Sequence, residues 1–333
     1  MLPSIFKKNQ QQLLFVYFLK RIKNFWNKKV PLSKGYDFSV YDPFDVLGED
    51  SGYEKLYLVG DNWIKEPDRP IAIAIGFNDW KFGFTADYLP EYRVAFVPRK
   101  LVNFNLARVM MKMQVEPKLA IIWGYNETKW LNNYLTYKKL EIWRAEDGFV
   151  RSADLGANGA TPYSLVFDKK GLYYNTDGSS ELNDLLDRYN VSEKNLKEGK
   201  KLFNLFQESN TSKYNPYFTQ KNHTIKTTQS ILVIGQVDSD ASLRFGNTEG
   251  WNAEDIVRLA KMENPSAQII YRPHPEIFKG YQDSKFKFDK VKFFAEIQSP
   301  EVDIIDAINK ADHVYTICSL AGLEAVLRNK KVT

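Results

Sequence analysis

The chain has 333 residues, of which 44% are hydrophobic and 26% charged, values typical of a soluble globular protein large enough for two domains. Its single cysteine, Cys318, excludes an internal disulfide framework and a cysteine-built zinc site, and it fits a cytoplasmic protein. The net charge of +5 comes from the N-terminus: residues 1–34 hold eight Lys/Arg and no Asp/Glu, whereas the other 299 residues hold 38 basic and 41 acidic side chains. The body of the protein is therefore not expected to bind nucleic acid.

Residues 1–35 form a basic segment with apolar and aromatic residues at helical spacing. Its apolar run, Leu13–Leu19, has seven residues and is far shorter than the roughly 20 needed to span a bilayer. A signal peptide is excluded because Lys20 and Arg21 follow this run at once, without a cleavage site of small residues. Two interpretations stay open: a helix that lies on an anionic membrane surface through residues 1–30, or an ordinary helix packed on the body.

The next part of the chain predicts two α/β domains joined by a helical bridge. Residues 36–175 hold short apolar strands at Lys55–Val59, Ile71–Gly76, Tyr92–Pro98 and Leu119–Trp123, with a helix at Asn103–Met113. Residues 176–228 are polar, with helices at Glu181–Tyr189 and Glu193–Phe206. Residues 229–333 alternate strands (Ile231–Ile234, Gln268–Tyr271, His313–Ile317) with helices (Ala253–Met262, Ile304–Asn309, Leu320–Arg328). This α/β fold of two Rossmann-like halves matches the GT-B plan of glycosyltransferases, with the ligand in the cleft, although a fold alone does not establish a function.

The turn after the strand Ile231–Ile234 carries the first group of candidate site residues. These are Gly235, Gln236, Asp238, Asp240 and Arg244. Ligands of open α/β sheets bind just outside the carboxyl ends of the strands, which favours a functional turn. The alternative is a surface turn with solvated aspartates.

Two further strand ends carry groups that bind anions. Arg272 and His274 lie in the sequence Arg-Pro-His-Pro, whose prolines fix the backbone, and they point to a phosphate or carboxylate ligand. Ser319 starts the last helix, where it predicts either a phosphate site or a simple N-cap, and Glu324 one turn later is placed to bind ribose hydroxyls. The alternative at Arg-Pro-His-Pro is a rigid turn with a solvated histidine.

The first half offers Glu146, Asp147 and Arg151, which predict either a second catalytic carboxylate or a salt-bridged turn. The sequence contains neither a GxxxxGK[ST] phosphate loop nor a GxGxxG fingerprint, which argues against a P-loop NTPase and a typical dehydrogenase. It also shows no dense acidic cluster, so we expect neither a required metal nor another cofactor.

Five segments in order resemble one family. They are EDGFVRS (146–152), PYSLVFDKKGLYY (162–174), GQVDSDASLRFG (235–246), YRPHP (271–275) and SLAGLEAVLRNKKVT (319–333). Together they resemble the KpsC/LipB-type capsule polysaccharide proteins, which are retaining β-Kdo transferases. The resemblance runs from about residue 143 to the end of the chain.

This resemblance implies a GT-B-like fold that takes CMP-β-Kdo as donor and retains configuration by a double displacement. By motif, Asp240 corresponds to the nucleophile, with Asp238 as the second choice, and Glu146 to the acid/base. His274 and Ser319 would hold the phosphate of CMP, and Glu324 the ribose. For the carboxylate of Kdo, Arg151 and Arg244 are the candidate partners.

The implied setting is capsule synthesis at the cytoplasmic face of the inner membrane, with peripheral attachment. The expected partners are a lipid-linked saccharide acceptor and the capsule export machinery. The family continues beyond the segment that ends at Thr333, so we expect a truncated C-terminus. Three alternatives remain: a transferase for another CMP-nonulosonate such as sialic acid, a non-catalytic assembly or docking module, and a nucleotide-sugar epimerase of related fold.

Overall fold

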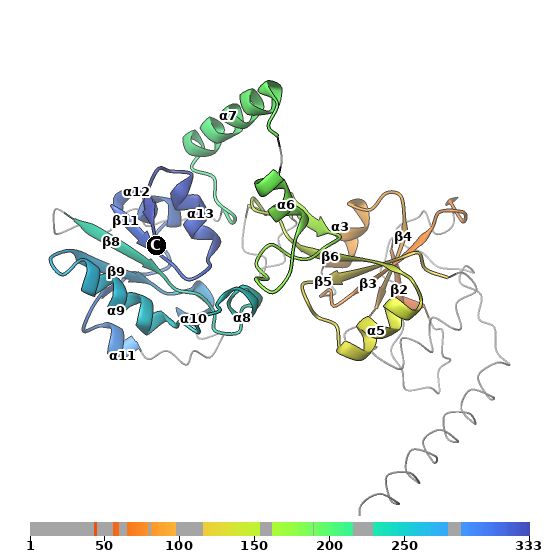
Figure 1. Cartoon of the computed structure of the whole chain (residues 1–333), viewed down its shortest axis with the longest axis horizontal. Helices are drawn as coiled ribbons and strands as arrows, with labels where there is room; N and C mark the ends of the chain where they lie inside the picture. Colours follow the sequence, from red (N-terminus) through yellow and green to blue (C-terminus); the bar gives the residue numbers. More distant parts are fainter. Residues whose placement is uncertain are drawn as a thin grey trace, which may run out of the picture. The chain divides into compact units, whose positions relative to one another are not determined.

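The computed structural model describes residues 43–44, 56–59, 65–78, 81–97, 116–153, 162–188, 190–215, 229–278 and 288–333. The basic segment 1–35 and the helix predicted at Asn103–Met113 lie outside these residues. The fold is mixed α/β with two sheets (Figure 1). By its contacts the chain divides into two compact units, Met1–Ile122 with Asn126–Ile142, and Trp123–Tyr125 with Trp143–Thr333. The predicted domain boundaries at residues 175 and 228 stay a prediction.

The first unit is built on strands whose residues are apolar on both faces. Its elements are β1 (Pro43–Phe44), β2 (Leu56–Val59), β3 (Ile71–Ile75), α3 (Phe82–Asp87), β4 (Arg93–Val97), β5 (Leu119–Trp123) and α5 (Lys129–Tyr137). All residues of β3 and β4 are buried, which explains why both read as continuous apolar runs. As the sequence predicts, β3 is parallel to β4 and β5, but β2 pairs with β4 in the antiparallel direction.

The second unit holds the remaining elements, apart from Glu141 and Ile142 at the start of β6, and it includes Trp123 at the end of β5. They are β6 (Glu141–Asp147), β7 (Leu165–Asp168), α6 (Glu181–Arg188), α7 (Glu193–Glu208), β8 (Ser230–Ile234), α8 (Ala241–Gly246), α9 (Ala253–Glu263), β9 (Gln268–Arg272), α10 (Pro275–Phe278), α11 (Phe288–Val291), β10 (Glu296–Ile297), α12 (Ile304–Lys310), β11 (His313–Tyr315), α13 (Leu320–Val326) and β12 (Lys331–Val332). Strands β6 and β7 form an antiparallel pair in which Glu146 lies opposite Val166, at the end of the sheet order β1-β2-β4-β3-β5-β6-β7. In the part of the chain that the structure describes, no helix has the length and apolar character needed to cross a membrane.

The second sheet has the topology of a Rossmann-type domain. Its order is β10-β9-β8-β11-β12, and all its pairs are parallel. From β8 the chain builds outward through β9 to β10, and it then returns to place β11 on the other side of β8. The loops after β8 and β11 therefore leave the sheet at a topological switch point, where ligands of such sheets bind.

Alternation along the strands of this sheet divides the core into two layers. Ile231 and Val233 of β8 pack with α9 on one face, whereas Leu232 and Ile234 pack with α12 and α13 on the other. Figure 1 shows α9 and the pair α12/α13 on opposite sides of the strands. The predicted parallel sheet with helices on both faces is confirmed for this part of the chain.

Candidate functional site

The loop after β8 begins with a close approach between backbone and side chain. The N–H of Gly235 donates to the carbonyl of Arg272 at 2.8 Å, and a Cβ at Gly235 would lie 2.4 Å from the hydroxyl of Tyr271. Because Tyr271 is buried, the loop can leave the sheet in this direction only with glycine at this position. Gly235 therefore sets the path of the loop that carries both aspartates.

Gln236 joins the two loops of the switch point. Its Oε1 accepts a hydrogen bond from the N–H of Cys318 at 3.0 Å, and its Nε2 donates to Oγ of Ser242 at 3.3 Å. Burial raises the pKa of the Cys318 thiol, which therefore stays protonated beside Gln236. The role of Gln236 in the structure is to tie the end of β8 to the loop that precedes α13.

Asp240 is the N-cap of α8 and is exposed to solvent. Its Oδ1 accepts hydrogen bonds from the N–H of Ser242 at 2.9 Å and from its hydroxyl at 3.0 Å, which fixes the orientation of the carboxylate. The two aspartates of this loop influence different tyrosines. Burial is the main cause of the raised pKa of Tyr173, and the charge of Asp240 adds to it. Burial is also the main cause of the raised pKa of Tyr271, and there the charge of Asp238 adds to it. Asp240 thus lies on the side of Tyr173.

Glu146 lies near the end of β6, and two hydrogen bonds hold its carboxylate. Oε1 accepts from the N–H of Asp147 at 2.9 Å, and Oε2 accepts from the hydroxyl of Tyr174 at 3.3 Å. Burial, together with the charge of Glu146, raises the pKa of Tyr174, so this phenol remains a donor. Burial also raises the pKa of Tyr173, and the charges of Glu146 and Asp240 add to that rise. The two predicted catalytic carboxylates are therefore neighbours of one tyrosine.

Aromatic packing explains how these distant segments meet. The ring of Tyr125 lies 4.5 Å from that of Phe245 in α8 and 6.2 Å from that of Tyr174, measured between centroids. The N–H of Thr176 donates to the carbonyl of Phe245 at 3.2 Å. The turn after β7 is thereby attached to α8, the helix that Asp240 caps.

His274 follows β9 and is part of the same cluster. Its Nδ1 accepts a hydrogen bond from the N–H of Glu276 at 3.3 Å, so the proton of the neutral ring is on Nε2. Burial lowers its pKa, and Asp240 and Lys213 are among the charges that act on it. His274 is therefore a neutral hydrogen-bond donor near Asp240 at neutral pH.

Ser319 is the N-cap of α13, and Glu324 lies one turn into this helix. The hydroxyl of Ser319 caps this helix by accepting from the N–H of Ala321 at 3.3 Å. Glu324 is only 5% exposed, and its Oε1 accepts from the N–H of Lys213 at 2.7 Å. Burial raises the pKa of Glu324. The predicted ribose ligand thus already binds the backbone of the chain, and its role toward a ribose stays a prediction.

Two of the three predicted arginines face acceptors within the protein. Arg151 has no exposed surface, and its Nε lies 2.9 Å from Oδ1 of Asp147. Arg272 is 6% exposed and donates to Gln298 at 3.0 Å and to the carbonyls of residues 300 and 302 at 3.1 and 2.7 Å. Burial lowers the pKa of Arg272 to about 10. Both guanidiniums thus interact with acceptors of the protein itself. For Asp147 and Arg151, this favours the predicted salt-bridged turn.

Arg244, the third predicted arginine, is exposed on α8, and its guanidinium lies 5.0 Å from the ring centroid of Phe245. The cation that the sequence analysis missed is Lys213, which contacts Glu324 through its backbone and acts electrostatically on His274 and Tyr173. Lys213 lies in the polar stretch 176–228, which was read as a linker. No spacing or periodicity marks it, because the residues around it are distant in sequence: Tyr173 is 40 residues before it and Glu324 is 111 residues after it.

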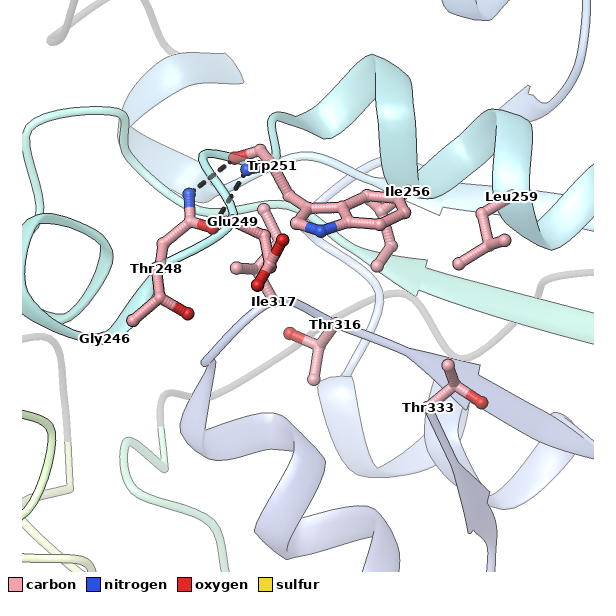
Figure 2. A pocket seen from close by; sticks show the side chains of 10 residues that line it. Gly246, Thr248, Glu249, Trp251, Ile256, Leu259, Thr316, Ile317 and Thr333 are labelled. Carbon is pink, nitrogen blue, oxygen red and sulfur yellow. Dashed lines mark hydrogen bonds between the residues drawn. The ribbon is translucent and has the colours of Figure 1, made fainter. Parts of the chain in front are cut away.

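A separate cavity lies beside α8 (Figure 2). It has a volume of about 250 Å³ and is lined by Gly246, Asn247, Thr248, Glu249, Trp251, Ile256, Leu259, Thr316, Ile317 and Thr333. The side chain of Asn247 holds the Trp251 backbone through two hydrogen bonds of 2.7 and 2.9 Å. The carboxylates Glu146 and Asp240 are not among the described residues that line it, so the cavity is distinct from the cluster above.

Across the described ranges, no group of three or more His, Cys, Asp or Glu residues is arranged to hold a metal ion. The fold defines an α/β protein with a Rossmann-type parallel sheet. Asp240 follows β8 at the switch point of this sheet, whereas Glu146 lies on β6 of the other sheet. Residues 119–333 match the family model described as capsule polysaccharide biosynthesis protein. The chain belongs to this family, and the resemblance to KpsC/LipB-type capsule proteins is confirmed.

Similar proteins are found in Rhizobium meliloti and Neisseria meningitidis. The chain is 33% identical over 311 residues to the lipopolysaccharide-processing protein LpsZ of Rhizobium meliloti, covering 91% of this chain and 70% of LpsZ. It is 32% identical over 263 residues to the capsule polysaccharide modification protein LipA of Neisseria meningitidis serogroup A, covering 78% of this chain and 36% of LipA. It thus spans only about a third of LipA.

Two solved structures share the fold, both of Thermosulfurimonas dismutans KpsC. The structure titled as its β-Kdo 2,4 transferase has a TM-score of 0.63 at 23% identity and covers 79% of both chains. The one titled as its β-Kdo 2,7 transferase has a TM-score of 0.57 at 24% identity and covers 79% of this chain and 77% of that one. At these identities the likeness concerns the fold.

Proposed function

We propose that the protein is a retaining β-Kdo transferase that takes Kdo from CMP-β-Kdo and transfers it to a saccharide acceptor in capsule synthesis. The family membership and the KpsC-like fold support a glycosyltransferase of this kind. The observation that carries the proposal is the position of Tyr174. Its hydroxyl donates to Glu146 at 3.3 Å, and its ring lies 6.4 Å from that of Phe245 in α8, the helix that Asp240 caps. Two carboxylates around one site are what retention by double displacement requires.

In the proposed first step, a carboxylate oxygen of Asp240 attacks the anomeric carbon of the sugar. The bond from this carbon to the phosphate oxygen breaks, and CMP leaves with the bonding electron pair. His274, which keeps its proton on Nε2, and Ser319 are the proposed donors to the phosphate. Because CMP leaves as a stable anion, this step needs phosphate binding more than it needs an acid.

In the proposed second step, the acceptor hydroxyl attacks the same carbon and the bond to Asp240 breaks. Glu146 takes the proton of the hydroxyl, and Tyr174 orients its carboxylate through the 3.3 Å hydrogen bond. Each step inverts the anomeric carbon, so the product keeps the β configuration. Glu324 is the proposed ligand of the ribose.

The assignment of Asp240 rather than Asp238 as nucleophile is supported by the neighbours of the two carboxylates. Asp240 acts on Tyr173 and His274, which belong to the cluster around Glu146, whereas Asp238 acts on the buried Tyr271. Asp240 is also exposed, so a donor sugar has access to it. Both observations favour Asp240.

The finer setting is also a proposal. The two-domain architecture is taken to be GT-B-like, the acceptor lipid-linked, and the protein peripheral at the inner membrane through its basic residues 1–30. Cosedimentation with anionic vesicles tests this attachment: it should fall sharply when residues 1–30 are deleted. Equal cosedimentation of both forms would contradict it.

The function is tested by incubating the protein with CMP-Kdo and a capsule-linker acceptor. The expected result is release of CMP together with a β-linked Kdo product, identified by NMR of the anomeric linkage. If CMP is released only from a sialic acid donor, the proposed donor sugar Kdo is wrong and the protein uses another nonulosonate. An Asp240→Ala variant as active as the wild type would favour a docking module.

A further inference from the structure

Lys213 is a cation close to the carboxylates Glu146 and Asp147. Its carbonyl accepts hydrogen bonds from the N–H groups of Arg151 at 2.9 Å and Ser152 at 3.2 Å, and its own N–H donates to Glu324 at 2.7 Å. The neighbouring residue Tyr214 forms a parallel bridge with Ser152. The backbone of Lys213 is therefore held both by the segment after β6 and by α13, which limits where its side chain can reach.

The ammonium group lies among charged and phenolic groups of the site. Its nitrogen is 5.4 Å from the ring centroid of Tyr214. Burial opposes the charge, but Tyr214, Tyr173, Asp147 and Glu146 together raise the pKa of Lys213 above its usual value. The group is thus an ammonium at neutral pH. The same charge lowers the pKa of His274, which places Lys213 near the proposed phosphate donor as well.

Lys213 differs from the two buried arginines in what it binds. Arg151 pairs with Asp147, and Arg272 donates to three interior acceptors. Within the part of the chain that the structure describes, the Lys213 ammonium forms no direct ion pair with a carboxylate. The residue as a whole is partly exposed to solvent.

A donor of the proposed kind requires such a cation. Kdo carries a carboxylate on its anomeric carbon, and the phosphate of CMP is attached to the same carbon. The donor therefore brings two negative groups close to Asp240 and Glu146. Without a compensating cation the two enzyme carboxylates would repel the sugar. An ammonium next to the reacting carbon removes this repulsion, and it also selects for sugars that carry the carboxylate.

We propose that Lys213 binds the carboxylate of the donor sugar and makes the protein specific for 2-keto acid sugars over neutral ones. This inference rests on the proposed function and replaces the earlier candidates Arg151 and Arg244 for this role. Arg151 has no exposed surface, and Arg244 is a solvent-exposed residue whose guanidinium lies against the ring of Phe245.

The test compares two donors, CMP-Kdo and its C1 carboxamide, in the wild type and in Lys213→Met. The wild type should use the carboxylate donor about 100-fold better by kcat/KM. In Lys213→Met the value for CMP-Kdo should fall about 100-fold while that for the carboxamide stays unchanged, so the preference disappears. Lys213→Arg, which keeps the charge, should keep most of the preference. Lys197→Met, at an exposed lysine of α7, is the matched control and should behave as the wild type.

Equal losses on both donors in Lys213→Met would overturn the inference and indicate a role in the structure alone. If Lys213→Met fails to fold, the comparison of the two donors in the wild type still tests the inference. A wild type that uses both donors equally well would overturn it. If the wild type transfers no sugar from CMP-Kdo, the proposed function itself fails and the inference falls with it. Transfer from CMP-Kdo with a preference that survives Lys213→Met refutes only the inference.

Discussion

Replacing Arg272 by methionine separates a structural from a ligand-binding role for the Arg-Pro-His-Pro turn. The guanidinium is 6% exposed and donates to three buried acceptors at 2.7 to 3.1 Å. Methionine has a similar length but no donor, so these acceptors lose their partners. A buried acceptor left unsatisfied costs about 1–3 kcal/mol. Allowing for relaxation and water entry, we expect Arg272→Met to lower the free energy of unfolding by about 3–5 kcal/mol.

The assay is urea unfolding followed by circular dichroism, with Arg244→Met as the matched control. Arg244 is exposed, so its replacement should change the free energy of unfolding by no more than about 0.5 kcal/mol. For Arg272→Met, the fraction that remains folded should bind the CMP donor as the wild type does. A variant with wild-type stability and lost donor binding would refute the reasoning and restore Arg272 as a phosphate ligand.

Two further predictions concern the site. Tyr174→Phe removes the 3.3 Å hydrogen bond to Glu146, which is worth roughly 1–1.5 kcal/mol. The substitution should lower kcat about tenfold with little change in the KM for the donor. An unchanged kcat would contradict the role of Tyr174. Burial lowers the pKa of His274 and His313 below 6.5, so the unfolded chain binds protons more readily and stability falls as the pH drops below that value. His274→Asn should reduce this fall in urea titrations between about pH 7 and about pH 5, with His313 accounting for the remainder. A pH dependence identical to that of the wild type would show that His274 titrates normally.

The sequence predicts the strands of the second sheet well because their patterns are unambiguous. β8, β9 and β11 are short runs of β-branched and apolar residues buried on both faces, and a parallel sheet requires such runs. β6 was missed as a strand because its residues Glu141–Asp147 are mixed in polarity and mostly only partly buried. Its partner β7 was missed because it is a short strand with only three apolar residues, all of them partly buried.

The site is harder to predict than the fold because its geometry depends on contacts across long separations. Arg272 and His274 share one motif, but the acceptors that turn Arg272 inward lie 26 to 30 residues later. Lys213 belongs to a polar stretch without a pattern, and hydrogen bonds with Arg151, Ser152 and Glu324 bring it to the cluster. Motifs identify which residue types gather at the strand ends, whereas their orientation follows from packing.

The most direct test of the account is the mass of the intact protein after brief incubation with CMP-Kdo in the absence of acceptor. A double displacement through Asp240 predicts an added mass of one Kdo residue, located on Asp240 by peptide mapping. The adduct should be absent in Asp240→Asn and present in Asp238→Asn. An adduct on any other residue, or transfer of Kdo by a protein that never carries the added mass, would contradict the account.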